Sequence, residues 1–213
     1  MAFQGNWRFM FEWPLPLCKD PAEALRTNGD FAAAEALARS ELARHEKEKG
    51  RGHPDSLVFL DSLGTTFTCL KRLDEAESAY SESFASSEKA LGSEHPATLA
   101  RASNHALMLS ALGWSSKAVA ILEKVVETRR RLLGETELLF LTTEANLAIV
   151  LGIGGKTDRA NELFRSVLEK MSAAVEPDNL RLETVKFNYN AVRNSKSSGR
   201  GGQGSGGGPR RYH

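Results

Sequence analysis

Apolar residues recur along the chain with the spacing of amphipathic helices. Five of them fall at i, i+3, i+4, i+7 and i+8 and form one stripe of a helix: Ala118, Ile121, Leu122, Val125 and Val126. Another helix is predicted just before it, opened by Pro96 and ended by Gly113, since proline suits a first helical turn and glycine a tight C-terminal turn. Small Ala118 would let the two backbones approach, so the pattern predicts an antiparallel helix pair.

The same pattern returns every 42 residues. Glycines after the second helix, polar residues within the first, turn residues, small residues and large apolar residues form columns: Gly50, Gly92 and Gly134; Ser62, Asn104, Asn146 and Asn188; Gly29, Lys71, Gly113 and Gly155; Ala34, Ala76, Ala118 and Ala160; Tyr80, Leu122 and Phe164. A fixed period of this length is typical of a stacked array, in which each unit buries its apolar face against its neighbours.

The repeat predicts an all-α solenoid. We expect three complete helix pairs at about 54–91, 96–133 and 136–173, a helix of the second type at about 30–49 before them, and one of the first type at about 178–194 after them. Asp20, Pro21 and Glu23 indicate a short capped helix at the start. The chain therefore divides into an aromatic segment (1–19), the array (20–194) and a Gly/Ser/Arg tail (195–213) that we expect to be disordered.

The composition and charge of the chain argue against several classes of function. The net charge is +1, from 28 basic and 27 acidic residues, which leaves no strong field for nucleic acid or a membrane surface. No apolar run reaches the ~18 residues that a bilayer requires. Two cysteines and five scattered histidines provide neither a disulfide framework nor a zinc site, so we expect no metal, no cofactor and a reducing, cytoplasmic location.

The repeat resembles tetratricopeptide repeats, and its 42-residue form resembles the kinesin light chain family. Three stretches carry the resemblance: residues 91–99 (Leu-Gly-Ser-Glu-His-Pro-Ala-Thr-Leu), Asn146-Leu147-Ala148, and Gly155 with Ala160. The resemblance implies a right-handed superhelix whose first helices line a concave groove that holds extended peptides. The sequence departs from the family pattern at Lys71, which replaces a turn glycine, and at Glu137-Leu138, which replaces His-Pro.

By this resemblance, Asn104, Asn146 and Asn188 look like groove positions, with Ser62 in the first unit. An asparagine amide both donates and accepts, which suits the backbone of an extended chain. The alternative is that these side chains hold neighbouring helices together. Other positions on the same face are Val58, Asp61, Thr65, Ala100, Ser103, Leu107, Thr142, Ala145, Ile149, Thr184 and Phe187. None is Lys or Arg, so we expect a neutral or mildly apolar peptide.

The two ends suggest other roles. The first 13 residues contain Phe3, Trp7, Phe9, Phe11 and Trp13. This segment could dock on the first helices, pair copies of the chain, or lie in the groove, because Met10-Phe11-Glu12-Trp13 resembles the tryptophan-with-acid motifs that kinesin light chains bind. The tail contains one Arg-Gly-Gly, at residues 200–202, so RNA association through the tail is a further alternative. The oligomeric state stays open.

No catalytic motif emerges, and we expect a non-catalytic protein that binds a partner protein. Gly154-Gly155-Lys156-Thr157 resembles the end of a phosphate-binding loop, but its first glycine and preceding strand are missing, so we interpret it as a turn between helices. The run Arg129-Arg130-Arg131 is interpreted as a solvated helix end, where cations face the negative end of the helix dipole.

Overall fold

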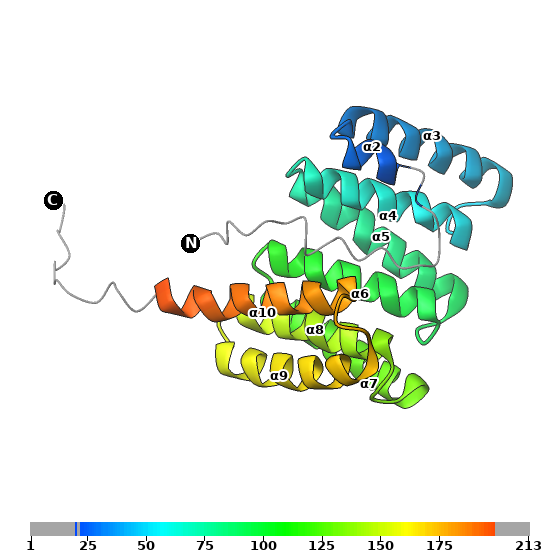
Figure 1. The fold of residues 1–213 in the computed structure, drawn as a ribbon. Coiled ribbons are helices and arrows are strands. Elements are labelled where there is room, and N and C mark those ends of the chain that lie inside the picture. Colours follow the sequence, from blue (N-terminus) through cyan, green and yellow to red (C-terminus); the bar gives the residue numbers. More distant parts are fainter. Residues whose placement is uncertain (1–19, 21, 199–213) are drawn as a thin grey trace, which may run out of the picture.

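The computed structural model describes residue 20 and residues 22–198, and every regular element among them is a helix (Figure 1). The helices are α2 (Glu23–Thr27), α3 (Phe31–Lys49), α4 (Pro54–Cys69), α5 (Leu73–Leu91), α6 (Pro96–Ala111), α7 (Ser115–Leu133), α8 (Leu138–Ile153), α9 (Thr157–Ala174) and α10 (Leu180–Ser198). The predicted all-α fold and its three helix pairs, α4/α5, α6/α7 and α8/α9, are confirmed. Helix α10 continues to Ser198, beyond the boundary predicted at Asn194.

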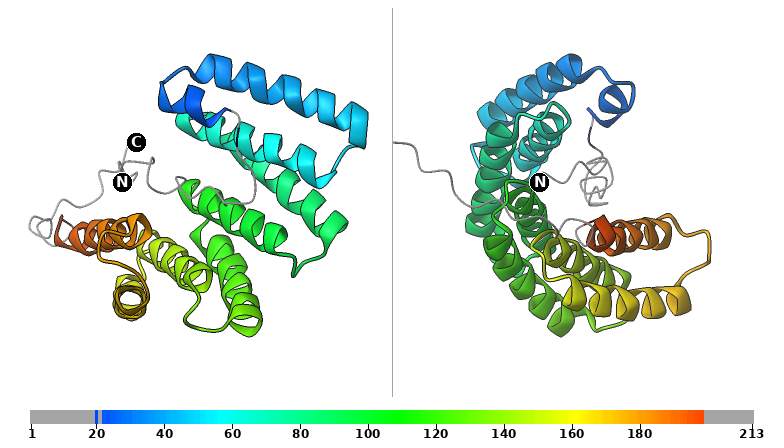
Figure 2. Two further views of the ribbon diagram at one scale, coloured as in Figure 1. Left: turned by 45° about the vertical axis from the view of Figure 1, so that its right-hand side comes forward. Right: turned by 90° about the vertical axis from the view of Figure 1, so that its left-hand side faces the viewer.

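Each helix from α3 to α9 packs against the helices before and after it in the sequence, and α10 packs against α9. In the second half of the array the first helices also pack together, α6 against α8 and α8 against α10, whereas no extensive contact among the described residues joins α5 to α7 or α7 to α9. The array must therefore curve with its first helices on the inside. Figure 2 shows the resulting open arc, with α10 on its inner side.

The turn between the helices of each pair depends on a left-handed residue. Gly113 and Gly155 have φ values of 86° and 80°, and Lys71, at the same place in the first pair, has a φ of 59°. A side chain disfavours this conformation, so the departure noted at Lys71 carries backbone strain. The stretch that resembles a phosphate-binding loop is such a turn, between α8 and α9.

The core is built from the repeating columns. Ala76, Ala118 and Ala160 are fully buried, and Tyr80, Leu122 and Phe164 fill the space four residues later. Tyr80 lies against Gly64 of α4 so closely that a Cβ at Gly64 would stand 2.9 Å from the ring. The next two pairs have Ala106 and Ala148 at that position, opposite Leu122 and Phe164. In each pair, a small residue on the first helix thus leaves room for the large side chain that packs against it from the second helix.

Helices α4 and α6 begin at the two His-Pro sequences. The Nδ1 atoms of His53 and His95 accept the backbone N–H groups of Asp55 and Ala97, at 3.2 and 3.1 Å. Glu137, at the corresponding place before α8, forms no side-chain cap. The third pair therefore begins without the hydrogen bond that the first two share.

The short opening helix exists, but the expected cap is wrong. Helix α2 begins at Glu23, its N-cap residue is Ala22, and no side chain caps it. Asp20 lies two residues further out and accepts the N–H of Ala22 at 3.0 Å. Its carboxylate also contacts Arg26 and Ser62. The prediction failed because a partner from α4, distant in sequence, competes for the carboxylate.

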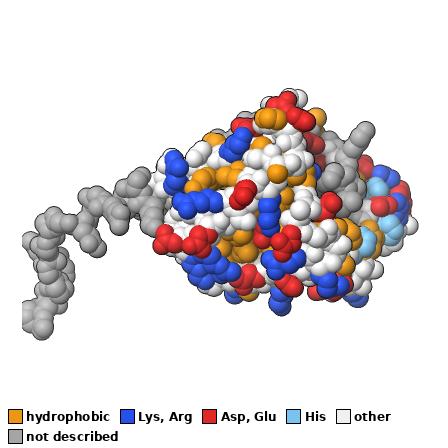
Figure 3. Space-filling model, turned by 60° about the horizontal axis from the view of Figure 1, so that its bottom comes forward, with side chains coloured by type: hydrophobic (Ala, Val, Ile, Leu, Met, Phe, Trp, Pro, Cys, Tyr) orange, Lys and Arg blue, Asp and Glu red, His pale blue; other side chains and the backbone are white. Residues whose placement is uncertain are grey.

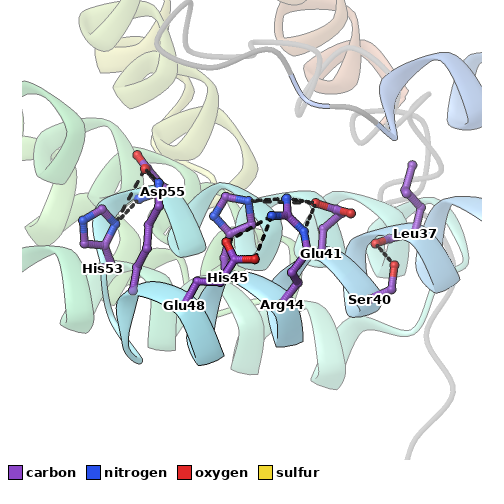
Figure 4. Close-up of polar contacts among 9 residues, drawn as sticks. Leu37, Ser40, Glu41, Arg44, His45, Glu48, His53 and Asp55 are labelled. Carbon is purple, nitrogen blue, oxygen red and sulfur yellow. Dashed lines mark hydrogen bonds and ion pairs between the residues drawn. The ribbon is translucent and has the colours of Figure 1, made fainter.

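The outer surface carries mixed charges. Figure 3 shows Lys and Arg interspersed with Asp and Glu over one face of the molecule. On α3, Arg44 bonds to both Glu41 and Glu48 (Figure 4). The ring of His45 packs against the ring of Phe59 of α4 in a tilted arrangement, with the ring centres 4.8 Å apart. Among the described residues, no helix has the length and apolarity to span a bilayer. In the same part of the chain, no cluster of His, Cys, Asp or Glu side chains could hold a metal ion.

Candidate functional site

The predicted groove positions lie on α4, α6, α8 and α10, the first-type helices at the inside of the arc. Each of these four helices carries one of them at the same place: Ser62, Asn104, Asn146 and Asn188. Asn104 is half-buried, whereas Asn146 and Asn188 are only 6% and 7% exposed. We call these four residues the polar column.

The three asparagines of the polar column have unused hydrogen-bonding capacity. Asn104 and Asn146 form no side-chain hydrogen bond to another described residue. The Nδ2 group of Asn188 is buried and has no partner among the residues that the structure describes. A buried amide without a partner is unfavourable by roughly 1–3 kcal/mol, so such groups are rare unless something else satisfies them. In the described residues, these amides do not bridge neighbouring helices, which was the structural alternative.

Ser62 differs from the asparagines because its hydroxyl is satisfied within the chain. It donates to Asp20 Oδ1 at 2.8 Å and accepts from Arg26 Nη1 at 3.0 Å. Asp20 precedes Ser62 by 42 residues, one full period, so it extends the polar column by one position. We did not include Asp20 in the predicted column, although the period alone could have identified it.

The other predicted groove residues are mostly turned into the protein. Thr65 Oγ1 lies 3.0 Å from the Tyr80 hydroxyl, and Thr142 Oγ1 donates to the Leu138 carbonyl at 2.7 Å. Leu107 and Ile149 belong to the apolar cluster formed by α6 to α10. These four side chains therefore lie beneath or beside the polar column.

The inner helices also contain a buried arginine, Arg101, that the sequence analysis did not identify. Arg101 of α6 is 6% exposed, and its Nε lies 3.0 Å from both Asp61 Oδ2 and Ser83 Oγ. Ser83 also donates to Asp61 Oδ1 at 2.6 Å. Burial raises the pKa of Asp61 to about 6, while Arg101 and Ser83 act in the opposite direction. The residues come from three helices of two pairs, so no local sequence pattern joins them.

Arg129 corrects one sequence interpretation. Arg130 and Arg131 are exposed, as expected of a solvated helix end, but Arg129 is only 3% exposed. Its Nη1 bonds to Thr143 of α8, and its Nε and Nη2 have no partner within the described part of the chain. Burial lowers the pKa of Arg129 to about 10. Arg129 follows Leu122 and Val125 on the buried stripe of α7, and this register directs it inward despite its charge.

Comparison with known families agrees with this geometry. Residues 22–89 and, in an overlapping match, residues 60–131 match the tetratricopeptide repeat family. The chain belongs to the tetratricopeptide repeat family. The matched residues run from α2 into α7 and include the first two positions of the polar column, Ser62 and Asn104.

Solved structures extend the agreement to the whole tetratricopeptide array. The nearly identical TPR-like repeats assigned to a kinesin light chain of Podosopora anserina match at 22% identity, with a TM-score of 0.66, over 91% of this chain and 90% of that one. BtubC (BKLC) from P. vanneervenii matches at 18% identity, with a TM-score of 0.65, over 90% and 82% of the two chains. No curated protein sequence matches the chain. The fold supports a general role in protein–protein interaction, and proteins built this way are typically non-catalytic scaffolds.

Proposed function

We propose that the inner face of the array binds an extended segment of a partner protein along the polar column, without catalysis. The observation that carries the proposal is the set of unused amides on Asn104, Asn146 and Asn188. Packed helices stand roughly 8–10 Å apart, and an extended chain advances roughly 3.3 Å per residue. One asparagine would therefore meet about every third peptide residue, with Thr142, Leu107 and Ile149 forming the floor beside the amides.

Charge supports a neutral or mildly apolar peptide along the asparagines. Two of the arginines that contact the inner helices, Arg26 and Arg101, are each paired with an aspartate, Asp20 and Asp61. Neither of these two cations is available to an anionic ligand while its aspartate stays in place. Amide contacts to the peptide backbone would tolerate different side chains, which suits recognition of a segment by its extended shape. A cytoplasmic location belongs to the same proposal, because a chain with two cysteines provides no disulfide framework.

The test is a peptide selection followed by a matched pair of variants. Peptides selected from a random library on the wild-type protein are measured by fluorescence anisotropy against Asn146→Leu and Asn161→Leu. Asn161 lies on α9, a second helix away from the polar column. We expect Asn146→Leu to lower affinity at least about tenfold, the effect of losing one or two hydrogen bonds, and Asn161→Leu to leave it unchanged. Equal affinities of the two variants would contradict the proposal.

A further inference from the structure

The carboxylate of Asp20 is held by donors from two helices. Arg26 of α2 pairs with its Oδ2, and Ser62 of α4 donates to its Oδ1 at 2.8 Å. Arg26 Nη1 in turn donates to Ser62 Oγ at 3.0 Å and to Thr66 Oγ1 at 3.4 Å. The Arg26 and Asp20 side chains are 11% and 17% exposed. This is a nearly enclosed arrangement in which a guanidinium N–H group, a hydroxyl and the backbone N–H of Ala22 donate to one carboxylate.

The position of the Asp20 carboxylate within the 42-residue repeat links it to the polar column. Asp20 stands one period before Ser62 and extends the polar column by one position, next to the asparagines that have no partner. The column thus has open amides on α6, α8 and α10 and a filled position at α4. The group that fills it belongs to the chain itself.

We propose that Arg26, Ser62 and Thr66 form a carboxylate subsite at one end of the groove, filled by Asp20 in the free protein and by an acidic side chain of the partner in the complex. This inference rests on the proposed function and specifies its ligand further. The partner segment is neutral where it crosses the asparagines and carries Asp or Glu about three residues beyond them.

The donors favour a carboxylate over a neutral group. A guanidinium and a hydroxyl that bond to the two oxygens of one carboxylate form charge-assisted hydrogen bonds, which are roughly twice as strong as neutral ones. Low exposure strengthens them further, because little water competes. A glutamine at the same place in the peptide would gain neither benefit and would leave Arg26 without a counterion.

Exchange depends on the rest of the peptide. Asp20 is tethered beside its donors, so its effective concentration there is on the order of millimolar or more, and a free carboxylic acid in dilute solution does not displace it. A peptide already bound along the asparagines presents its own acidic side chain at a similar effective concentration. Asp20 therefore acts as a competitor that selects for partners with the acid at the correct distance.

The first experiment tests the subsite without any peptide. In Asp20→Ala the donors lose their carboxylate, so 100 mM acetate should raise the melting temperature by about 2–4 °C relative to 100 mM chloride. Wild type, in which Asp20 fills the subsite, and Asp20→Ala/Arg26→Gln, in which the cation is gone, should show no such difference. Equal melting temperatures of Asp20→Ala in acetate and chloride would overturn the inference.

The second experiment uses a peptide selected on the wild-type protein and extended at either end by two glycines and then Glu or Gln. On Asp20→Ala, or on Asp20→Asn if the alanine variant does not fold, the Glu peptide should bind at least about tenfold more tightly than the Gln peptide. On wild type the preference should be smaller, because Asp20 competes. Equal binding of the two peptides by the Asp20 variant contradicts the subsite even if both bind.

The two proposals fail in different ways. If selected peptides bind but Asn146→Leu has no effect, the groove function is wrong, while acetate would still stabilise Asp20→Ala. If Asn146→Leu weakens binding but neither acetate nor Glu is preferred by the Asp20 variants, the groove stands and the carboxylate subsite is wrong.

Discussion

Buried arginines lie at two successive junctions between helix pairs, and their surroundings differ. Between the first and second pairs, Arg101 meets Asp61 and Ser83. Between the second and third, Arg129 bonds to Thr143, and its Nε and Nη2 find no partner in residue 20 or residues 22–198. A buried charge is tolerated when it is paired and hydrogen-bonded and is otherwise unfavourable. The same fold thus contains one completed polar junction and one incomplete one, and they should respond oppositely to mutation.

The largest effect is expected at the completed junction. Arg101→Met removes the cation and leaves the partly buried Asp61 carboxylate without its counterion, which should lower the free energy of unfolding by about 3–5 kcal/mol. Urea denaturation followed by circular dichroism measures the change. The double variant Arg101→Met/Asp61→Leu should recover most of the loss. A double variant as unstable as the single one would show that the charge pair is not the cause.

A second contrast concerns packing within the same two pairs. Gly64→Ala would drive a methyl group into the ring of Tyr80, which is held by Thr65, and should destabilise by about 1–3 kcal/mol. Combining it with Tyr80→Leu recreates the Ala106 and Leu122 arrangement of the second pair and should restore much of the stability. Thermal melts of the three variants check this, and a double variant less stable than Gly64→Ala would contradict the volume argument.

The incomplete junction should show the opposite sign. Arg129→Met removes a buried charge that has no acidic partner and keeps most of the side-chain volume. We expect the free energy of unfolding to stay the same or rise by about 1–2 kcal/mol. Measured beside Arg101→Met under the same conditions, this variant tests the comparison directly. A loss of several kcal/mol would mean that Arg129 is satisfied as well as Arg101.

The smallest effect is expected at the turns. Lys71→Gly should stabilise by about 1 kcal/mol, because glycine adopts a φ of 59° without steric strain. The reverse change in the second pair, Gly113→Lys, should destabilise by a similar amount. Melting temperatures of both variants decide the point, and a stabilising Gly113→Lys would contradict it.

The fold was predictable because the period repeats local rules. Glycines at turns, alanines at close approaches and large apolar residues four positions later recur every 42 residues, so each column reinforced the others. The polar contacts between helices were harder to predict from the sequence. Arg101, Asp61 and Ser83 come from three helices, and the inward direction of Arg129 depends on its register on α7. Asp20 could have been found by extending the polar column one period back, but its nearness to Pro21 and Glu23 favoured a local cap instead.

The uneven contacts between first and second helices have a mechanical consequence. First helices lean on one another, while α7 and the start of α9 are bridged by the exposed pair Glu123–Arg159, at 2.8 Å. Straightening the arc under tension lengthens its inner edge relative to its outer edge, so the contacts of α6 with α8 and of α8 with α10 would be strained first. Because those inner helices would separate and reorient as the arc straightens, load on the ends and occupancy of the inner face are coupled.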